Sequence, residues 1–344
     1  MSSQHKSLQA LYPWTKSPII VNGPMYRISM SRLATAVTQS GGIGFIASGL
    51  DQSSLLNELS FIAKALNHTP SAENPLPVGV GFINWGSNLD YALQAIEKYI
   101  PAAVWFFAPR QPEDLKLWSD RVREASKGKT AIWVQVGTVA QALQAAELCN
   151  PEVLVVQGSD AGGHGTANAA GIITVLPEVA DTLEEKGFGH IPLVAAGGIS
   201  DGRGVAAATL LGAQGVVLGT RFIACSEAEI SKDYQHDVLA ASDGGQSTVR
   251  NVFFDELRGP NEWPAYMDGR GLRDRALEDS ERGMSLEENR RIYKEGLEKG
   301  DRSRVTRYAG TGVGLVREVL GAREIMEGLR RECGMALEKA VAGM

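Results

Sequence analysis

One histidine lies in a segment whose composition suits catalysis. His164 falls within residues 157–165 (QGSDAGGHG), directly after the apolar run 153–156. Such a run predicts a buried strand, so the histidine is expected on a loop just past the carboxyl end of that strand. Glycines carry no Cβ and let a planar ligand lie against the backbone, while imidazole exchanges protons readily near neutral pH. The segment therefore predicts a catalytic pocket with His164 as its proton-transfer group.

A structural role for this histidine is the alternative. A histidine can bridge two loops, but Gly162, Gly163 and Gly165 leave little side chain nearby to bury the ring, which favours catalysis. Asp160 lies four residues before His164 and is predicted to cap the loop rather than to act as a base. No His, Cys and carboxylate spacing suits a metal, and no GxSxG motif supports serine hydrolase chemistry.

Two glycine-rich turns further along the chain predict an anion site. Residues 195–199 (AAGGI) and 217–221 (VLGTR) each continue an apolar strand candidate into small residues and a helix-compatible segment. Bare backbone N–H groups at the start of a helix bind anions, and a threonine hydroxyl adds a donor. Tight βα turns would explain either segment alone, whereas two in succession favour a phosphate site. Neither follows a GxxxxGK(S/T) or GxGxxG pattern. The residues expected to hold the phosphate are Gly197, Gly198, Gly219 and Thr220.

Four further residues are expected to face the same ligand. Pro24 and Met25 end the first strand candidate, where the adaptable methionine could pack against a flat ring or fill the core. Gln135 and Gln157 lie near the ends of predicted buried strands, where an amide needs hydrogen-bond partners. A ligand ring edge or the backbone of a neighbouring loop could supply those partners.

The elements that must position these residues alternate regularly between 18 and 222. The strand candidates are Ile19–Asn22, Gly44–Ala47, Val78–Phe82, Val104–Phe107, Ile132–Val136, Leu154–Gln157, Leu193–Ala196 and Val216–Leu218. The helical patterns between them include Arg32–Gln39, Leu55–Ala65, Leu89–Tyr99, Asp114–Glu124, Ala140–Leu148 and Gly204–Leu211. Apolar strands alternating with helices predict an α/β fold of the TIM (β/α)8 barrel type, with an open doubly wound sheet as the alternative.

The composition changes after residue 228. Residues 229–303 are polar, charged and rich in helix formers, with an irregular break at 258–264 (RGPNEWP). We therefore expect a barrel over residues 1–228 and a smaller, mainly helical substrate domain over the C-terminal mouth. Residues 304–344 are expected to return to the barrel, with a helix over Leu315–Leu329.

The composition of the whole chain narrows the choice of partners and compartment. The 344 residues carry 34 basic and 40 acidic side chains, a net charge of -6, without any basic block. This balance disfavours a nucleic-acid partner, and no stretch is apolar enough for a membrane span or a signal peptide. The three cysteines form no disulfide or metal pattern. We expect a cytoplasmic protein, with a homodimer as one option.

These segments together resemble a known family. Residues 18–25 (PIIVNGPM), 41–47 (GGIGFIA), 157–164, 195–199 and 218–222 (LGTRF) are similar to nitronate monooxygenase, formerly called 2-nitropropane dioxygenase. The resemblance covers most of the barrel and reaches residues 309–315 (AGTGVGL). The Gly-Gly-His motif is its specific part, whereas the AAGGI and LGT segments also occur in other flavin and phosphate-binding barrels.

The resemblance implies a TIM barrel that holds non-covalent FMN beneath a helical substrate domain. It implies that Gln157 and Gly162 contact the flavin, that Pro24 and Met25 lie at its ring, and that His164 is the catalytic histidine. The predicted phosphate residues would then hold the phosphate of FMN. Many relatives have an asparagine in the third strand, for which Asn84 is the candidate here, and a glutamate where Asp160 stands. Residues 245–303 match bacterial members poorly.

The function that follows is the oxidation of alkyl nitronates, and of neutral nitroalkanes if they are accepted, with O2 to a carbonyl compound and nitrite. The first alternative is an FMN-dependent NAD(P)H reductase of quinones or enoyl thioesters. The second is a flavin-binding protein without turnover.

Overall fold

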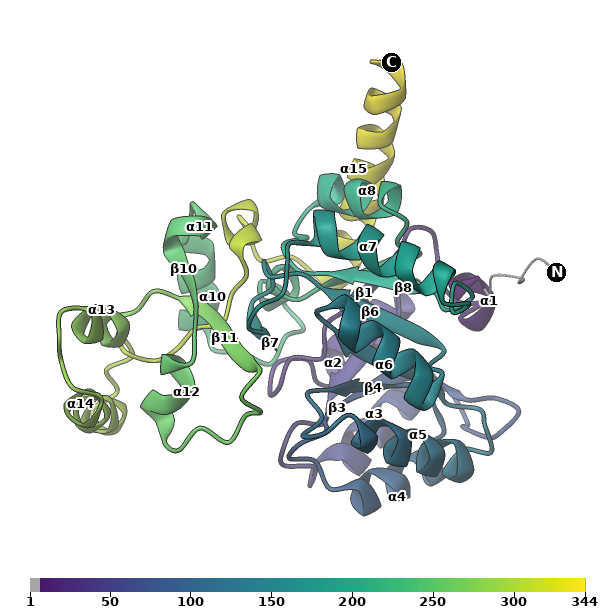
Figure 1. Ribbon diagram of the computed structural model, residues 1–344, viewed down its shortest axis with the longest axis horizontal. Coiled ribbons are helices and arrows are strands. Elements are labelled where there is room, and N and C mark those ends of the chain that lie inside the picture. The colour runs from purple at the N-terminus through teal and green to yellow at the C-terminus, as the bar shows by residue number, and fades with distance from the viewer. Residues whose placement is uncertain (1–6, 344) are drawn as a thin grey trace.

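The computed structural model describes residues 7–343, and its larger part is a barrel of parallel strands surrounded by helices (Figure 1). The strands are β1 (Ile19–Asn22), β2 (Phe45–Ala47), β3 (Leu76–Ile83), β4 (Pro101–Phe107), β5 (Ala131–Val136), β6 (Val153–Gln157), β8 (Leu193–Ala196) and β9 (Gly215–Leu218). They form one eight-stranded sheet in the order β1-β9-β8-β6-β5-β4-β3-β2. A parallel bridge between Val21 and Ile43 brings its two edges together. The predicted barrel is confirmed.

Helices α2 to α9 follow the strands in turn and surround this sheet, whereas α1 (Leu8–Leu11) lies at its amino-terminal end. They are α2 (Ser31–Gln39), α3 (Leu55–Ala65), α4 (Leu89–Tyr99), α5 (Glu113–Ala125), α6 (Val139–Cys149), α7 (Ile172–Glu185), α8 (Gly202–Leu210) and α9 (Thr220–Ile223). Several begin where a polar side chain caps the first turn, since Asn88, Thr138 and Asp201 accept backbone N–H groups of α4, α6 and α8. The sequence thus marks these helix starts locally.

Large aromatic side chains fill the inside of the barrel. The rings of Trp105 and Trp133 stack with their centroids 5.9 Å apart, and Phe45 packs against both. Trp133 donates its indole N–H to the hydroxyl of Tyr12, which follows α1. Because α1 and these rings fill the amino-terminal part of the barrel, the space for a ligand lies at the carboxyl ends of the strands.

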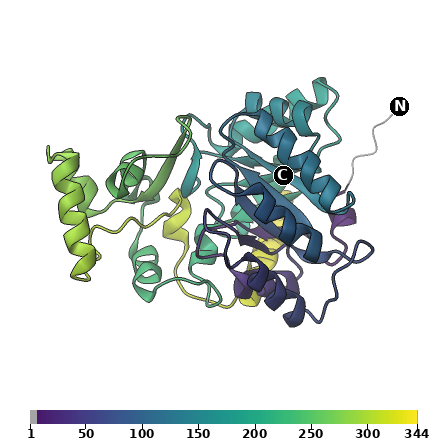
Figure 2. The same ribbon diagram turned by 90° about the horizontal axis from the view of Figure 1, so that it is seen from below.

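The cap, which we define as residues 229–303, lies beside this carboxyl end (Figures 1 and 2). Its helices are α10 (Lys232–Ala240), α11 (Gly244–Ser247), α12 (Phe253–Arg258), α13 (Arg275–Glu281) and α14 (Leu286–Glu298), and its strands are β10 (Thr248–Asn251) and β11 (Met267–Leu272). The strands form an antiparallel sheet in the order β10-β11-β7, and β7 (Gly163–Thr166) comes from the loop after β6.

This sheet corrects one expectation and adds to another. The segment around His164 is a strand rather than a loop, and the cap contains two strands beside its helices. Both differences have one cause, since β11 pairs with β10 on one edge and with β7 on the other, and each strand needs the others for its hydrogen bonds. The boundaries at 228 and 303 remain our proposal.

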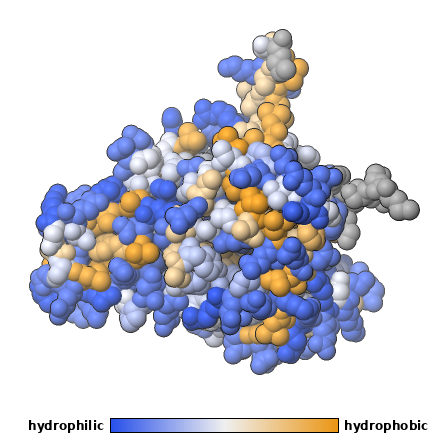
Figure 3. Space-filling view, viewed as in Figure 1, coloured by the Kyte–Doolittle hydropathy of each residue, from blue (hydrophilic) through white to orange (hydrophobic). Residues whose placement is uncertain are grey.

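The returning segment, residues 304–344, begins irregularly and ends in a long helix. The helix predicted over Leu315–Leu329 is instead a 3-10 turn, η1 (Thr311–Leu315), followed by α15 (Ala322–Ala342), which packs on α8 and α2. The last turns of α15 project from the barrel and carry exposed apolar residues such as Met335 and Val341 (Figure 3). Within residues 7–343, every helix is too short or too polar to cross a membrane.

Candidate active site

A cavity of about 900 Å³ lies at the carboxyl ends of the barrel strands, between the barrel and the cap. All of the site residues predicted from the sequence lie on its wall: Pro24, Met25, Gln135, Gln157, Gly162, His164, Gly197, Gly198, Gly219 and Thr220. The structure thus brings together residues that end or follow β1, β5, β6, β8 and β9, with His164 on the short strand after β6. Their individual roles remain predictions.

One wall of the cavity consists of glycine-rich turns and is called here the glycine wall: Gly197, Gly198, Gly219 and Thr220, joined by Gly310 and Gly312. Gly198 has a φ of +74° and an added Cβ would lie 2.9 Å from the Cβ of Asp160, so only glycine suits this turn. Thr220 Oγ1 accepts the N–H of Gly310 at 2.9 Å, which leaves the hydroxyl hydrogen free to be donated.

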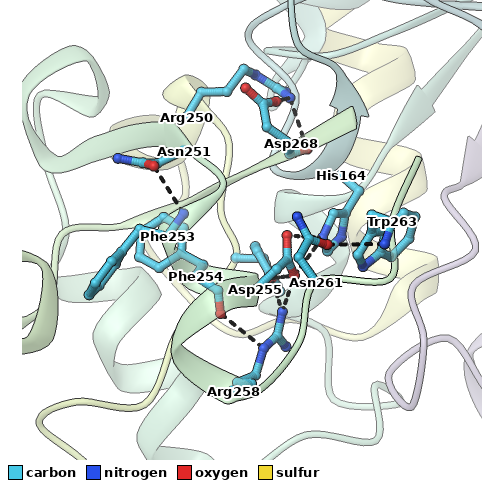
Figure 4. Close-up of polar contacts among 11 residues, drawn as sticks. His164, Arg250, Asn251, Phe253, Phe254, Asp255, Arg258, Asn261, Trp263 and Asp268 are labelled. Carbon is cyan, nitrogen blue, oxygen red and sulfur yellow. Dashed lines mark hydrogen bonds and ion pairs between the residues drawn. The ribbon is translucent and has the colours of Figure 1, made fainter. Parts of the chain in front are cut away.

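His164 lines the same cavity, and its ring is largely enclosed. Its Nε2 is 2.9 Å from both carboxylate oxygens of Asp255 on α12 (Figure 4). The indole of Trp263 stacks on the imidazole with centroids 3.7 Å apart and an interplanar angle of 10°. Only 11% of the histidine side chain is exposed. The expectation that little side chain would surround this ring was wrong, because the enclosing groups come from the cap.

Asp255 is itself held by several donors. Arg258 Nη2 lies 2.5 Å from Asp255 Oδ1, the Tyr308 hydroxyl donates to the same oxygen at 3.3 Å, and Arg258 also donates to the Tyr308 hydroxyl. Burial raises the pKa of the Asp255 carboxyl, but the hydrogen bond from His164 and the charges of His164 and Arg258 outweigh it. The pKa of Asp255 therefore lies below its ordinary value, and the group is ionised at neutral pH. Burial raises the pKa of the Tyr308 phenol well above its usual value.

The strand pairing places His164 within reach of these groups. His164 is opposite Gly269 in the β7–β11 ladder. A Cβ on Gly269 would lie 2.9 Å from the ring of Tyr308 and 3.6 Å from Nε2 of His164. The glycine thus leaves the space in which the imidazole and the phenol meet.

The two glutamines each keep part of their amide for a ligand. Gln135 accepts the indole N–H of Trp105 at 3.1 Å, and Gln157 donates to the backbone carbonyl of His164 at 3.3 Å. Both glutamines line the cavity, so each amide can bond to the protein and to a ligand at the same time. Met25 packs against the core and also faces the cavity, which joins the two roles considered for it.

Two residues discussed from the sequence lie outside the cavity wall. Asp160 accepts the hydroxyl of Thr311 at 2.9 Å, so it ties its loop to η1 instead of capping that loop alone. Asn84 accepts the backbone N–H of Phe107 at 2.8 Å and is buried. Within residues 7–343, His, Cys, Asp and Glu form no group of three or more that could hold a metal.

Sequence reasoning missed Asp255, Arg258, Trp263 and Tyr308. The irregular break at 258–264 was the available signal, because a tryptophan in a charged, proline-flanked loop needs a packing partner. Nothing in the sequence marked Asp255, which sits 91 residues from its histidine.

Fold and cavity together define the class of protein. A parallel barrel with a cavity at the carboxyl ends of its strands, glycine turns after β8 and β9 and an enclosed histidine–aspartate pair has the layout of a TIM-barrel enzyme. The model of the nitronate monooxygenase family matches residues 116–332. Nitronate monooxygenase npaC from Metarhizium robertsii is 42% identical, over 98% of this chain and 97% of that protein. Nitronate monooxygenase from Neurospora crassa is 37% identical, over 97% and 94%. The chain belongs to the nitronate monooxygenase family and is an oxidoreductase.

Solved structures show the same fold. Nitroalkane oxidase from Streptomyces ansochromogenes superposes with a TM-score of 0.75 at 23% identity, over 97% of this chain and 100% of that chain. FabK from Thermotoga maritima gives a TM-score of 0.74 at 25% identity, over 98% of both chains. The barrel is thereby confirmed, and the open doubly wound sheet is excluded.

Proposed function

We propose that this protein is an FMN-dependent nitronate monooxygenase that converts alkyl nitronates and O2 to a carbonyl compound and nitrite, and that also accepts neutral nitroalkanes. The observation that carries the proposal is that the glycine wall and His164 line one cavity at the carboxyl ends of the strands. That combination suits an anionic cofactor held beside a proton-transfer group. Family membership supports the choice of reaction.

The residues present fit FMN. A volume of about 900 Å³ is in the range of cofactor sites. Gly197, Gly198, Gly219 and Thr220 would hold the phosphate through backbone N–H groups and the free hydroxyl hydrogen. Pro24, Met25, Gln135, Gln157 and Gly162 would contact the ring system. When bound, the flavin supplies the electron transfer and the reaction with O2.

The protein's own side chains handle the substrate. His164 takes the α-proton of a neutral nitroalkane, whereas a nitronate has already lost that proton and is only oriented by the ring. Trp85 and Phe107 pack against Trp263 with ring centroids 5.4 and 5.9 Å apart, and all three line the cavity. This aromatic wall suits the alkyl part of the substrate and excludes water from the reacting atoms.

The test compares two substrates in one variant. The purified protein is expected to be yellow and to consume O2 with propyl-2-nitronate. His164→Asn should keep the colour and the turnover of nitronate, but lose about 100-fold or more in turnover of neutral 2-nitropropane, because a general base contributes about 10²–10⁴-fold. His236→Asn, at an exposed position on α10, is the matched control.

Two outcomes would contradict the proposal. An unchanged rate of His164→Asn on the neutral nitroalkane would remove the base assignment. Anaerobic bleaching of the yellow protein by NADH or NADPH, and not by nitronate, would indicate the reductase alternative instead.

A further inference from the structure

Asp255 and His164 form a buried pair that the proposed reaction does not by itself explain. Nε2 is equally distant, 2.9 Å, from both oxygens of the carboxylate. The side chains are 11% and 5% exposed. A carboxylate in such a place normally costs stability unless its charge is used or compensated. The pair lies on the cavity wall, which places the carboxylate next to the reacting group.

The charge of Asp255 decides where the imidazole proton lies. An ionised carboxylate has no hydrogen to donate, so Nε2 must carry the hydrogen in both the neutral and the charged ring. In the neutral ring the lone pair is then on Nδ1. Among residues 7–343, Nδ1 has no hydrogen-bond partner, so this nitrogen is left for a substrate.

Other contacts keep the ring and the carboxylate in place. Trp263 covers one face of the imidazole in a nearly parallel stack, and Tyr308 lies tilted beside it at 5.2 Å. Arg258 donates to Asp255 and to the backbone carbonyl of Phe254. The charged or titratable side chains in contact with the pair are thus Arg258 and Tyr308, one cationic and one neutral, and neither removes the negative charge from the carboxylate.

We propose that Asp255 is a positioning residue that fixes His164 as the Nε2–H tautomer, presents Nδ1 as the proton acceptor and stabilises the resulting imidazolium. This inference rests on the proposed function of His164 as a base. In the step concerned, the substrate Cα–H bond breaks, its electron pair remains on the substrate as the nitronate, and the proton forms an N–H bond at Nδ1. The positive charge then lies between the substrate and the Asp255 carboxylate.

The kinetic test uses the flavin-loaded enzyme and two substrates. Asp255→Asn should lower kcat/KM for neutral 2-nitropropane about 100-fold, while kcat/KM for propyl-2-nitronate changes less than about threefold. Asp255→Ala should behave alike. If Asp255 had a purely structural role, its replacement would lower kcat/KM for both substrates together.

Asp268→Asn is the matched control. Asp268 also lies in the cap and forms a buried ion pair, 2.5 Å from Arg250 with side chains 13% and 9% exposed, but it is absent from the cavity wall. The variant Asp268→Asn should leave the ratio of kcat/KM for the two substrates unchanged. A rise in the neutral-substrate rate of Asp255→Asn would show that Asp255 only occupies the nitrogen that the substrate needs, and would overturn the proposal.

A spectroscopic measurement separates this proposal from the proposed function. The imidazole ¹⁵N signals of His164, assigned by their loss in His164→Asn, should show a hydrogen on Nε2 of the neutral ring in the wild type. In Asp255→Asn that preference should fall. A hydrogen on Nδ1 in the wild type would overturn the proposal whether or not the enzyme oxidises nitronates. Failure to oxidise nitronate with the expected tautomer present would contradict the proposed function alone.

Discussion

Two parts of the cavity wall are built by different means. Most of the glycine wall consists of two turns, Gly197–Gly198 and Gly219–Thr220, that directly follow β8 and β9, and only Gly310 and Gly312 come from the returning segment. The histidine side depends on contacts between distant segments, because β7 carries His164 and the cap supplies Asp255 and Trp263. Cofactor binding should therefore depend on the barrel, whereas proton transfer should depend on how the cap packs against the barrel.

The largest expected effect is on the glycine wall. Gly198→Ala forces an alanine into a φ of +74° and against the Cβ of Asp160. The turn must shift or carry about 1–3 kcal/mol of strain, which corresponds to a loss of FMN affinity of about 5- to 150-fold. Titration of the apoprotein with FMN, monitored by flavin fluorescence, measures this affinity.

A second glycine variant separates the effect of backbone strain from the effect of lying on the cavity wall. Gly187→Ala has a similar φ of +82°, but nothing lies within 4 Å of its added Cβ, and it follows α7 outside the cavity wall. It should lose stability without losing FMN affinity. Equal FMN affinities of the two variants would show that the turn after β8 does not hold the cofactor.

A smaller effect is expected on the histidine side. Trp263→Ala removes the ring stacked on His164. Aromatic pairs contribute about 0.5–1.5 kcal/mol beyond burial, so kcat/KM for nitronate should fall about 2- to 10-fold. FMN affinity should change less than about twofold. Trp14→Ala, whose ring contacts Tyr12, is the control for loss of a tryptophan. If Trp263→Ala lost as much FMN affinity as Gly198→Ala, the distinction between the two parts of the cavity wall would be wrong.

The smallest effect concerns the stability of the cap. Burial raises the pKa of Asp274, which caps α13, from 3.8 to about 6. Between these values the folded protein keeps a proton that the unfolded chain has lost, so the free energy of unfolding falls as pH rises through this window. The fall is at most about 3 kcal/mol, since one pKa unit corresponds to about 1.4 kcal/mol.

Asp274→Asn should remove this dependence. Asparagine also caps helices and has no charge to desolvate, so the variant should be more stable than the wild type above pH 6. Urea unfolding at pH 4 to 8 measures the difference, with the exposed Asp181→Asn on α7 as control. The ratio of kcat/KM for the neutral nitroalkane to kcat/KM for the nitronate should stay unchanged in both variants. A wild-type stability that rises from pH 4 to 6 would contradict the assignment.

The barrel could be predicted closely because its signals are local. β1 and β8 match the predicted strands to the residue, since each is an uninterrupted apolar run that ends at a glycine or asparagine. β4 begins three residues earlier than predicted, at Pro101, because proline and alanine do not resemble a strand. The cap strands were missed for the same reason. β11 (MDGRGL) has glycines and charges, and it is a strand because β7 and β10 flank it.

The sequence by itself determined which barrel residues line the cavity. Strand ends, glycine turns and the place of His164 follow from short-range patterns, so these residues could be named in advance. Only the tertiary structure decided what surrounds His164. Carboxylates are rarely buried, and Asp255 becomes so only when β7 pairs with β11 and brings the cap over the ring. The chemistry of the histidine thus depends on a contact that spans 91 residues.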